Sequence, residues 1–232
     1  MPSDKSTISA PAIIGKAQLY NVDCMEYIKN LPDKAFDLAI VDPPYGIGID
    51  GQNKKVPAKT RRSKYRVSKQ CRKHHEFKGW DVMPTAEYFS ELIRISMNQI
   101  IWGGNYFTEY LPPKKAWIFW YKGQHDLTMS DGEMAWTSFD KVTRHFELSR
   151  GALTADGTIH PTQKPVKLYE WLLANYAKPG QRILDTHLGS MSSVIACNNL
   201  GFEIVGCELN EDYFKAGCER SNNALRQERM FK

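Results

Sequence analysis

The chain has 232 residues, enough for one sizeable α/β domain and too few for a second large one. No apolar run is long enough to cross a membrane, and the N-terminal stretch "MPSDKSTISA" lacks the apolar core of a signal peptide. The five cysteines form no CxxC pair, which argues against a disulfide framework. These properties exclude membrane-spanning and disulfide-rich secreted proteins, and we expect a cytoplasmic protein with no membrane partner.

Strand-like and helix-like stretches alternate along the chain, which is typical of an α/β fold. Strands are predicted at residues 17–22, 36–41, 98–103, 115–121, 133–139, 181–186 and 203–208. Apolar residues at helical spacing predict helices at residues 85–97, 164–180, 190–201 and from 211 onward, with Pro165 at a first helical position. Two stretches, 46–80 and 140–160, interrupt the alternation, and we interpret them as irregular insertions that contact the substrate.

The stretch "AIVDPPYGIG", residues 39–48, leaves a predicted buried strand through one acid, two prolines and a tyrosine. Asp42 lies at the carboxyl end of that strand, where open α/β sheets bind their ligands. Pro43 and Pro44 have no N–H and a fixed φ, so the chain leaves the sheet as stiff backbone. Taken alone, the stretch also fits an ordinary proline-terminated strand.

The net charge of +5 is distributed unevenly. Residues 51–79 contain 11 of the 31 Lys and Arg residues and one acid, Glu76, so the rest of the chain has a net charge of −5. This predicts a segment that contacts nucleic acid, although a merely solvated loop has the same composition. The residues predicted to contact phosphates are Lys59, Arg61, Arg62, Lys64, Arg66, Lys69, Arg72 and Lys73.

A metal site is not expected in this basic segment. Cys71 lies near His74 and His75, but the sequence has no second group of ligands with the spacing of a zinc site.

The stretch "IHPTQKPV", residues 159–166, gathers polar side chains on a proline-stiffened loop before a helix. His160, Thr162, Gln163 and Lys164 are able to hold a carboxylate and an amine together. The alternative is an ordinary helix start with Thr162 as its cap.

Residues 181–208 read as a strand, a glycine-containing turn, a helix and a second strand. Asp185 ends the first strand and Glu208 ends the second, 23 residues later, close to the spacing of about 20 for an acid that binds ribose hydroxyls. Met191 stands where a second glycine is usual, which favours a nucleoside ligand without a tightly held pyrophosphate. A plain βαβ crossover is the alternative.

The stretches at residues 39–48, 159–166 and 181–208 together resemble the β group of S-adenosylmethionine-dependent DNA amino-methyltransferases, whose motif order is circularly permuted. "DPPY" at residues 42–45, "HPTQKP" at 160–165 and the cofactor strands at 185–208 occur in the order of that group. "IIWGGNYF" and "EMAWTSF" are similar to small phage and prophage members, and the resemblance spans about residues 17 to 220. It implies a single Rossmann-like methyltransferase domain over 1–232, with a mostly parallel seven-stranded sheet, helices on both faces, and DNA contacts from segments 51–79 and 140–158.

The resemblance also implies roles for individual residues. Asp42 and Pro43 would accept the two N–H bonds of the target amine, Pro44 would keep these acceptors fixed, and Tyr45 would stack on a base flipped out of double-stranded DNA. Met191 departs from the family's glycine, a change without consequence if residue 191 has a negative φ. The residues implied to bind the cofactor S-adenosyl-L-methionine are Asp23, Cys24, Asp42, His160, Thr162, Gln163, Lys164, Asp185, Thr186, Leu188, Gly189, Ser190 and Glu208.

The resemblance favours adenine N6 as the methylated atom, because cytosine-N4 enzymes of the family more often begin the tetrapeptide with Ser. Cytosine N4 remains the alternative. A non-catalytic nucleic-acid-binding protein with this fold is a second alternative. Asp42 counts against an RNA or protein amide methyltransferase, and a homodimer is an open expectation.

Overall fold

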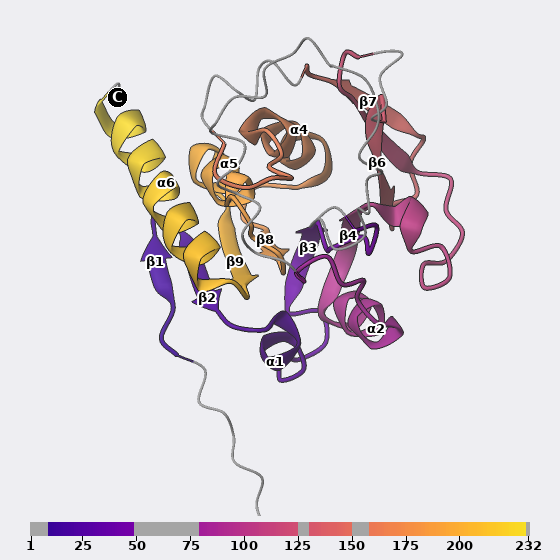
Figure 1. Cartoon of the computed structure of the whole chain (residues 1–232), viewed down its shortest axis with the longest axis horizontal. Coiled ribbons are helices and arrows are strands. Elements are labelled where there is room, and N and C mark those ends of the chain that lie inside the picture. The colour runs from indigo at the N-terminus through magenta and orange to yellow at the C-terminus, as the bar shows by residue number, and fades with distance from the viewer. Residues whose placement is uncertain (1–8, 49–78, 125–129, 150–157, 231–232) are drawn as a thin grey trace, which may run out of the picture.

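The computed structural model describes residues 9–48, 79–124, 130–149 and 158–230. Its centre is one twisted sheet in which nine strands have the order β1-β2-β9-β8-β3-β4-β6-β5-β7 (Figure 1). Five of the eight strand pairings are parallel. The strands are β1 (Ala12–Ile14), β2 (Ala17–Asn21), β3 (Phe36–Val41), β4 (Ser96–Trp102), β5 (Trp117–Tyr121), β6 (Gly132–Thr137), β7 (Arg144–Glu147), β8 (Arg182–Asp185) and β9 (Glu203–Glu208).

Helices cover both faces of the sheet, as Figure 1 shows. Leu168, Leu172 and Val194 from α4 and α5 pack into one core cluster, and Ile28 and Phe89 from α1 and α2 pack into another. Within the described part of the chain, no helix is long and apolar enough to cross a membrane. The helices are α1 (Cys24–Ile28), α2 (Ala86–Ile95), η2 (Gly104–Tyr106, a 3-10 turn), α4 (Val166–Tyr176), α5 (Ser192–Leu200) and α6 (Glu211–Met230).

The α/β fold with a mostly parallel sheet is as predicted, but the predicted number of strands, seven, is wrong. The two additional strands, β1 and β7, pair at the two edges of the sheet and are only three and four residues long. β7 lies inside the stretch 140–160, which was expected to be irregular. β7 pairs with β5, and its Phe146 ring packs against Trp171 of α4, with ring centroids 5.4 Å apart.

The predicted helices at residues 85–97, 164–180 and 190–201 are each shorter in the structure, as α2, α4 and α5. α2 ends at Ile95 rather than Met97, because Ser96 and Met97 already belong to β4. Pro165 is the N-cap of α4 with an extended backbone, one position before the first helical residue.

The parallel strands determine where a site can form. β2, β9, β8, β3 and β4 run in the same direction, so their carboxyl ends meet along one edge of the sheet. The chain leaves that edge at Asp42, at Gly103 and at Thr186, and Glu208 is the last residue of β9. This edge is where a doubly wound sheet binds ligands.

Candidate active site

A cavity of about 1270 Å³ opens at the carboxyl ends of the strands. The four predicted catalytic residues line it, and so do all of the predicted cofactor residues except Asp185. These lining residues are Asp23, Cys24, Asp42, Pro43, Pro44, Tyr45, His160, Thr162, Gln163, Lys164, Thr186, Leu188, Gly189, Ser190 and Glu208.

Asp42 and Tyr45 form a rigid unit directly after β3. The Tyr45 hydroxyl donates a hydrogen bond of 2.7 Å to Oδ1 of Asp42. A Cβ on Gly103 would lie 2.2 Å from Cε1 of Tyr45, so glycine is needed for the Tyr45 ring to fit at the end of β4. The ring also stacks on Tyr106, with centroids 5.0 Å apart and an interplanar angle of 20°.

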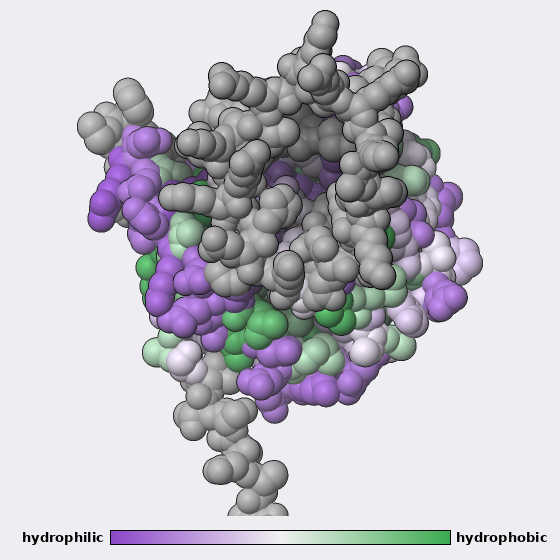
Figure 2. Space-filling model, viewed as in Figure 1, coloured by the Kyte–Doolittle hydropathy of each residue, from purple (hydrophilic) through white to green (hydrophobic). Residues whose placement is uncertain are grey.

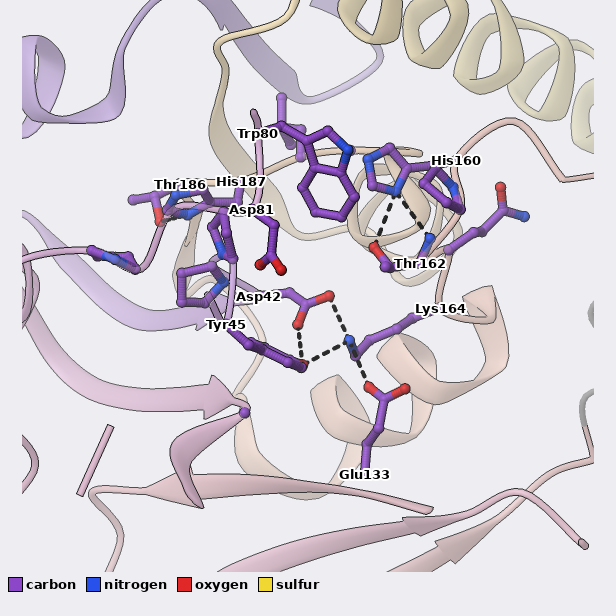
Figure 3. Close-up of a pocket in the computed structure, with 18 of the residues that line it drawn as sticks. Asp42, Tyr45, Trp80, Asp81, Glu133, His160, Thr162, Lys164, Thr186 and His187 are labelled. Carbon is purple, nitrogen blue, oxygen red and sulfur yellow. Dashed lines mark hydrogen bonds and ion pairs between the residues drawn. The ribbon is translucent and has the colours of Figure 1, made fainter. Parts of the chain in front are cut away.

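Lys164 connects the Asp42 loop to β6, as Figure 3 shows. Its Nζ lies 2.5 Å from Oδ2 of Asp42 and 2.9 Å from Oε2 of Glu133. Glu133 pairs in turn with Lys122. The lysine that the resemblance assigns to the cofactor therefore contacts the predicted catalytic carboxylate, and four alternating charges cross the wall of the cavity.

Burial and charge act in opposition on the pKa values of Asp42, Lys164 and Glu133. Burial raises the pKa of the Asp42 carboxyl, and the Lys164 ammonium opposes the rise. Burial lowers the pKa of Lys164, but the carboxylates of Asp42 and Glu133 outweigh it and raise the pKa above its usual value. Burial also acts to raise the pKa of Glu133, whereas the ammonium groups of Lys164 and Lys122 hold it at about 2. Lys164 and Glu133 are thus both charged at neutral pH.

Asp185 lies behind the cavity wall and only 1% of it is exposed. Its Oδ2 accepts a hydrogen bond of 2.6 Å from Ser193 Oγ, and its Oδ1 accepts one of 3.1 Å from the backbone N–H of His187. Burial raises the pKa of Asp185 to about 7. The carboxyl group therefore fixes the turn between β8 and α5 rather than forming its surface.

Thr186 and His187 occupy that turn. The Thr186 hydroxyl lies 2.7 Å from the Tyr88 hydroxyl and 2.9 Å from Nδ1 of His187. Burial lowers the pKa of His187 to about 4, so the imidazole is neutral at pH 7. The side chains at these two positions form a polar but uncharged part of the wall.

Glu208 closes the turn from the end of β9. Its Oε2 accepts a hydrogen bond of 2.8 Å from the N–H of Gly189, and its Oε1 accepts one of 2.9 Å from the N–H of Asn210. Each carboxylate oxygen keeps a second lone pair for a ligand. Gly189 has φ +49°, and a Cβ there would lie 3.7 Å from the His160 ring, so the turn and the His160 loop meet closely.

Met191 does not have the negative φ that would make the replacement of the family's glycine inconsequential. It has φ 59° and ψ 30° at the N-cap of α5, a left-handed conformation that costs a non-glycine residue about 1 kcal/mol or more. The side chain is fully buried, and a Cβ built on Gly217 of α6 would lie only 2.7 Å from its Cγ. We attribute the retention of this conformation to the packing between α5 and α6.

The loop that contains His160 is held by its own polar groups. His160 Nδ1 lies 3.1 Å from the Thr162 hydroxyl, and Gln163 Oε1 accepts a hydrogen bond of 3.1 Å from the N–H of Ile159. The His160 ring also meets Tyr213 of α6 edge-on, with centroids 4.4 Å apart.

Asp23 and Cys24, at the start of α1, also line the cavity. Asp23 is the N-cap of this helix, and its Oδ1 accepts a hydrogen bond of 2.7 Å from the N–H of Met25. Burial raises the pKa of Cys24 to about 12, so its thiol stays protonated.

Several lining residues were not predicted from the sequence, among them Trp80, Asp81, Tyr106, Lys122 and Glu133. Asp81 Oδ1 accepts a hydrogen bond of 2.8 Å from the N–H of Gly46, which ties the segment after residue 78 to the Asp42 loop. Glu133 had a detectable signal, an acid within the apolar stretch "EMAWTSF", whereas nothing local distinguished the others.

The rim of the cavity carries exposed apolar side chains. Ile47, Val82 and Met83 line the cavity with 48%, 68% and 37% of their surface exposed. Figure 2 shows apolar residues that reach the surface of this face among mainly hydrophilic ones.

The eight basic residues predicted to contact DNA lie outside the described residues, as do Cys71, His74 and His75. Of the segment 140–158, residues 140–149 and 158 are described, and Arg144, His145 and Glu147 are exposed there. Within the described ranges, no group of three or more His, Cys, Asp and Glu residues is arranged to hold a metal ion.

Comparisons with known proteins show what this chain is similar to. YubD of Escherichia coli (strain K12), described as a methylase, is 25% identical over 207 residues that cover 85% of this chain and 87% of YubD. The M1.HpyAVI–SAM complex has a TM-score of 0.57 at 20% identity and covers 88% of this chain and 99% of that one. The cytosine-N4-specific PvuII DNA methyltransferase has a TM-score of 0.58 at 12% identity, with 95% and 96% covered.

The structural likenesses show the shared fold. The family model N6_N4_Mtase, described as DNA methylase, matches residues 97–219, which is more than half of the chain. This protein belongs to that family of DNA methylases.

Proposed function

We propose that this protein transfers a methyl group from S-adenosylmethionine to the exocyclic N6 of adenine in double-stranded DNA, after the base has been flipped out of the duplex. The observation that carries the proposal is that Asp42 and the Gly189–Glu208 turn line one continuous cavity. At about 1270 Å³, the cavity exceeds the roughly 300–1,000 Å³ of a typical small-molecule pocket. It has room for a cofactor and a base side by side.

The residues present fit the cofactor. Glu208 has free lone pairs for two ribose hydroxyls, and Gly189 and His160 line the same cavity. Asp23 would accept a hydrogen bond from the nucleoside amine, and Thr162 lines the same cavity. When bound, S-adenosylmethionine supplies a methyl group on a positively charged sulfur.

The Asp42 loop fits the target amine. The lone pair of an exocyclic amine is delocalised into its ring, so the nitrogen is a poor nucleophile. A carboxylate oxygen of Asp42 and the carbonyl oxygen of Pro43 would accept its two N–H bonds and favour the tetrahedral geometry of the product. Tyr45 and the half-exposed Tyr106 offer a stacked aromatic surface to the flipped base.

The choice of adenine rests on Asp42 as the first residue of the tetrapeptide, as the resemblance implies. Cytosine N4 is the alternative, because it presents the same type of amine and because PvuII methyltransferase, with a similar fold, is cytosine-N4-specific.

The proposal is tested by incubating the protein with S-adenosylmethionine and duplex DNA of varied sequence and identifying the nucleosides by mass spectrometry after digestion. N6-methyldeoxyadenosine is the expected product. N4-methyldeoxycytidine would overturn the base assignment and leave the reaction class intact. Unmodified DNA would overturn the proposed activity.

A further inference from the structure

The pairing of Lys164 with two carboxylates has a consequence for the transfer step. Lys164 lies on the loop before α4, and only 3% of its side chain is exposed. A buried ammonium group must place three N–H donors. Nζ donates one hydrogen bond to Oδ2 of Asp42 and a longer one of 3.4 Å to the Tyr45 hydroxyl, and it forms an ion pair of 2.9 Å with Oε2 of Glu133. The centre of the Trp102 ring lies 5.3 Å from Nζ.

Glu133 is well placed to fix the position of Lys164. It lies within β6, where its backbone pairs with Trp120 of β5. Its other carboxylate oxygen pairs with Lys122, which follows β5 and is only 15% exposed. The carboxylate is therefore oriented from both sides, by a ladder of backbone hydrogen bonds and by a second lysine.

We propose that Glu133 is a positioning residue for methyl transfer, which keeps the Lys164 ammonium against Asp42 so that this carboxylate stays ionised and correctly aimed at the target amine. The role in transfer rests on the proposed function, whereas the effect of Glu133 on Asp42 does not. Lys122 supports the arrangement by orienting Glu133.

The groups around Asp42 allow the direction of the effect to be worked out. Lys164 and Glu133 face it from two elements, Tyr45 lies on its own loop, and Tyr169 of α4 and Asp185 of β8 lie behind it. The direct effect of removing the Glu133 charge is to lower the pKa of Asp42, because the repulsion between the two carboxylates is lost. Releasing Lys164 would raise it, because the attraction at 2.5 Å is weakened. Coulomb energy falls with distance, so the nearer group dominates.

We expect Glu133→Gln to raise the pKa of Asp42. The change keeps the size of the side chain and removes its charge. The measurement is a ¹³C NMR titration of protein labelled at the aspartate carboxyl carbons, with the Asp42 signal assigned by its loss in Asp42→Asn. This readout needs neither cofactor nor activity. Glu203→Gln, an exposed glutamate at the opposite end of β9, is the control and should leave the titration unchanged.

We also expect Glu133→Gln to slow single-turnover methyl transfer by about tenfold to a hundredfold, as for the loss of a hydrogen bond to a charged group. The acidic limb of the pH profile should move to higher pH, while the affinity for S-adenosylmethionine stays the same. Glu133→Asp, which keeps the charge, should recover part of the rate.

The background of Lys164→Met gives a second test. Without Lys164 only the direct repulsion remains, so Glu133→Gln should then lower the pKa of Asp42 instead of raising it. If the pKa falls in both backgrounds, or does not change, Glu133 does not position Lys164 and the proposal is wrong. If the titration behaves as expected but wild-type protein methylates no DNA base, the proposed function fails while the positioning stands.

Discussion

At the residue scale, Asp42 is held at both oxygens, by Tyr45 at 2.7 Å and by Lys164 at 2.5 Å. We expect Asp42→Asn to slow methyl transfer by about 10²–10³-fold. A neutral amide stabilises the positive charge that develops on the amine nitrogen less well than a carboxylate does. Affinity for S-adenosylmethionine should be mostly retained. Single-turnover kinetics and calorimetric titration measure the two effects.

Asp33→Asn is the matched control, since 75% of the Asp33 side chain is exposed on the surface. An Asp42→Asn variant with the transfer rate of wild type would remove Asp42 from the mechanism.

Asp185 leads to a prediction about stability. Burial raises its pKa to about 7 from the usual 3.8, so the folded protein holds a proton that the unfolded chain releases between about pH 4 and pH 7. The free energy of unfolding therefore loses a contribution from this group as pH rises through that window. The Asp185→Asn variant has no titrating group at this position, so its free energy of unfolding does not fall in this way as pH rises.

We expect the stability of Asp185→Asn relative to wild type to increase between pH 4 and pH 7, by roughly 4 kcal/mol at most. Guanidinium unfolding at several pH values measures the difference. His187, whose pKa of about 4 gives the opposite trend, contributes to both proteins and cancels. Parallel stability curves would show that Asp185 titrates normally.

At the element scale, the seven predicted strands were found because each has three or more apolar or β-branched residues within a short stretch. β1 and β7 were missed because their pairing depends on the neighbouring strand rather than on their own sequence. "RHFE" in β7 has three charged or titratable residues in four, and it is placed by its pairing with β5 and by the contact of Phe146 with Trp171.

The packing of α5 on α6 supplies the next prediction. Met191→Gly removes the left-handed strain but also removes a buried side chain, and the second effect is larger, at about 2–5 kcal/mol against about 1–2 kcal/mol. We expect stability to fall in the order wild type, Met191→Gly, Met191→Ala, because alanine keeps the strain and loses the packing. Urea unfolding measures the order.

Gly217→Ala tests the same contact from α6. Alanine favours a helix by about 1 kcal/mol over glycine, but here its Cβ would overlap Met191. We expect it to destabilise the wild type and to stabilise Met191→Gly. The same effect in both backgrounds would show that the two residues do not touch.

At the scale of the whole molecule, the sequence located the site but not all of its contacts. The ends of strands β3, β8 and β9 were readable because motifs mark them. The contact between Asp42 and Lys164 joins residues 122 positions apart, and that between Lys164 and Glu133 joins the loop before α4 to strand β6. Such pairings follow from the sheet order, which local patterns do not contain.

The distribution of charge concerns the molecule as a whole, since residues 51–79 are strongly basic and the rest of the chain has a net charge of −5. If the basic segment contacts DNA phosphates, each lost contact should reduce the slope of log K against log salt by about 0.9. We expect replacement of Arg61, Arg62, Lys64 and Arg66 by Gln to weaken DNA binding and to make this slope shallower, by up to about 3.6.

The control makes the same change in net charge elsewhere, by replacing Lys29, Lys115, Lys178 and Lys215, all exposed, with Gln. Fluorescence anisotropy with labelled duplex DNA at several salt concentrations measures both variants. A general effect of net charge would change the salt dependence of DNA binding similarly in the two variants, because both have the same net charge. A loss of slope confined to the first variant would therefore assign the phosphate contacts to residues 51–79, and equal slopes would leave that segment a solvated loop.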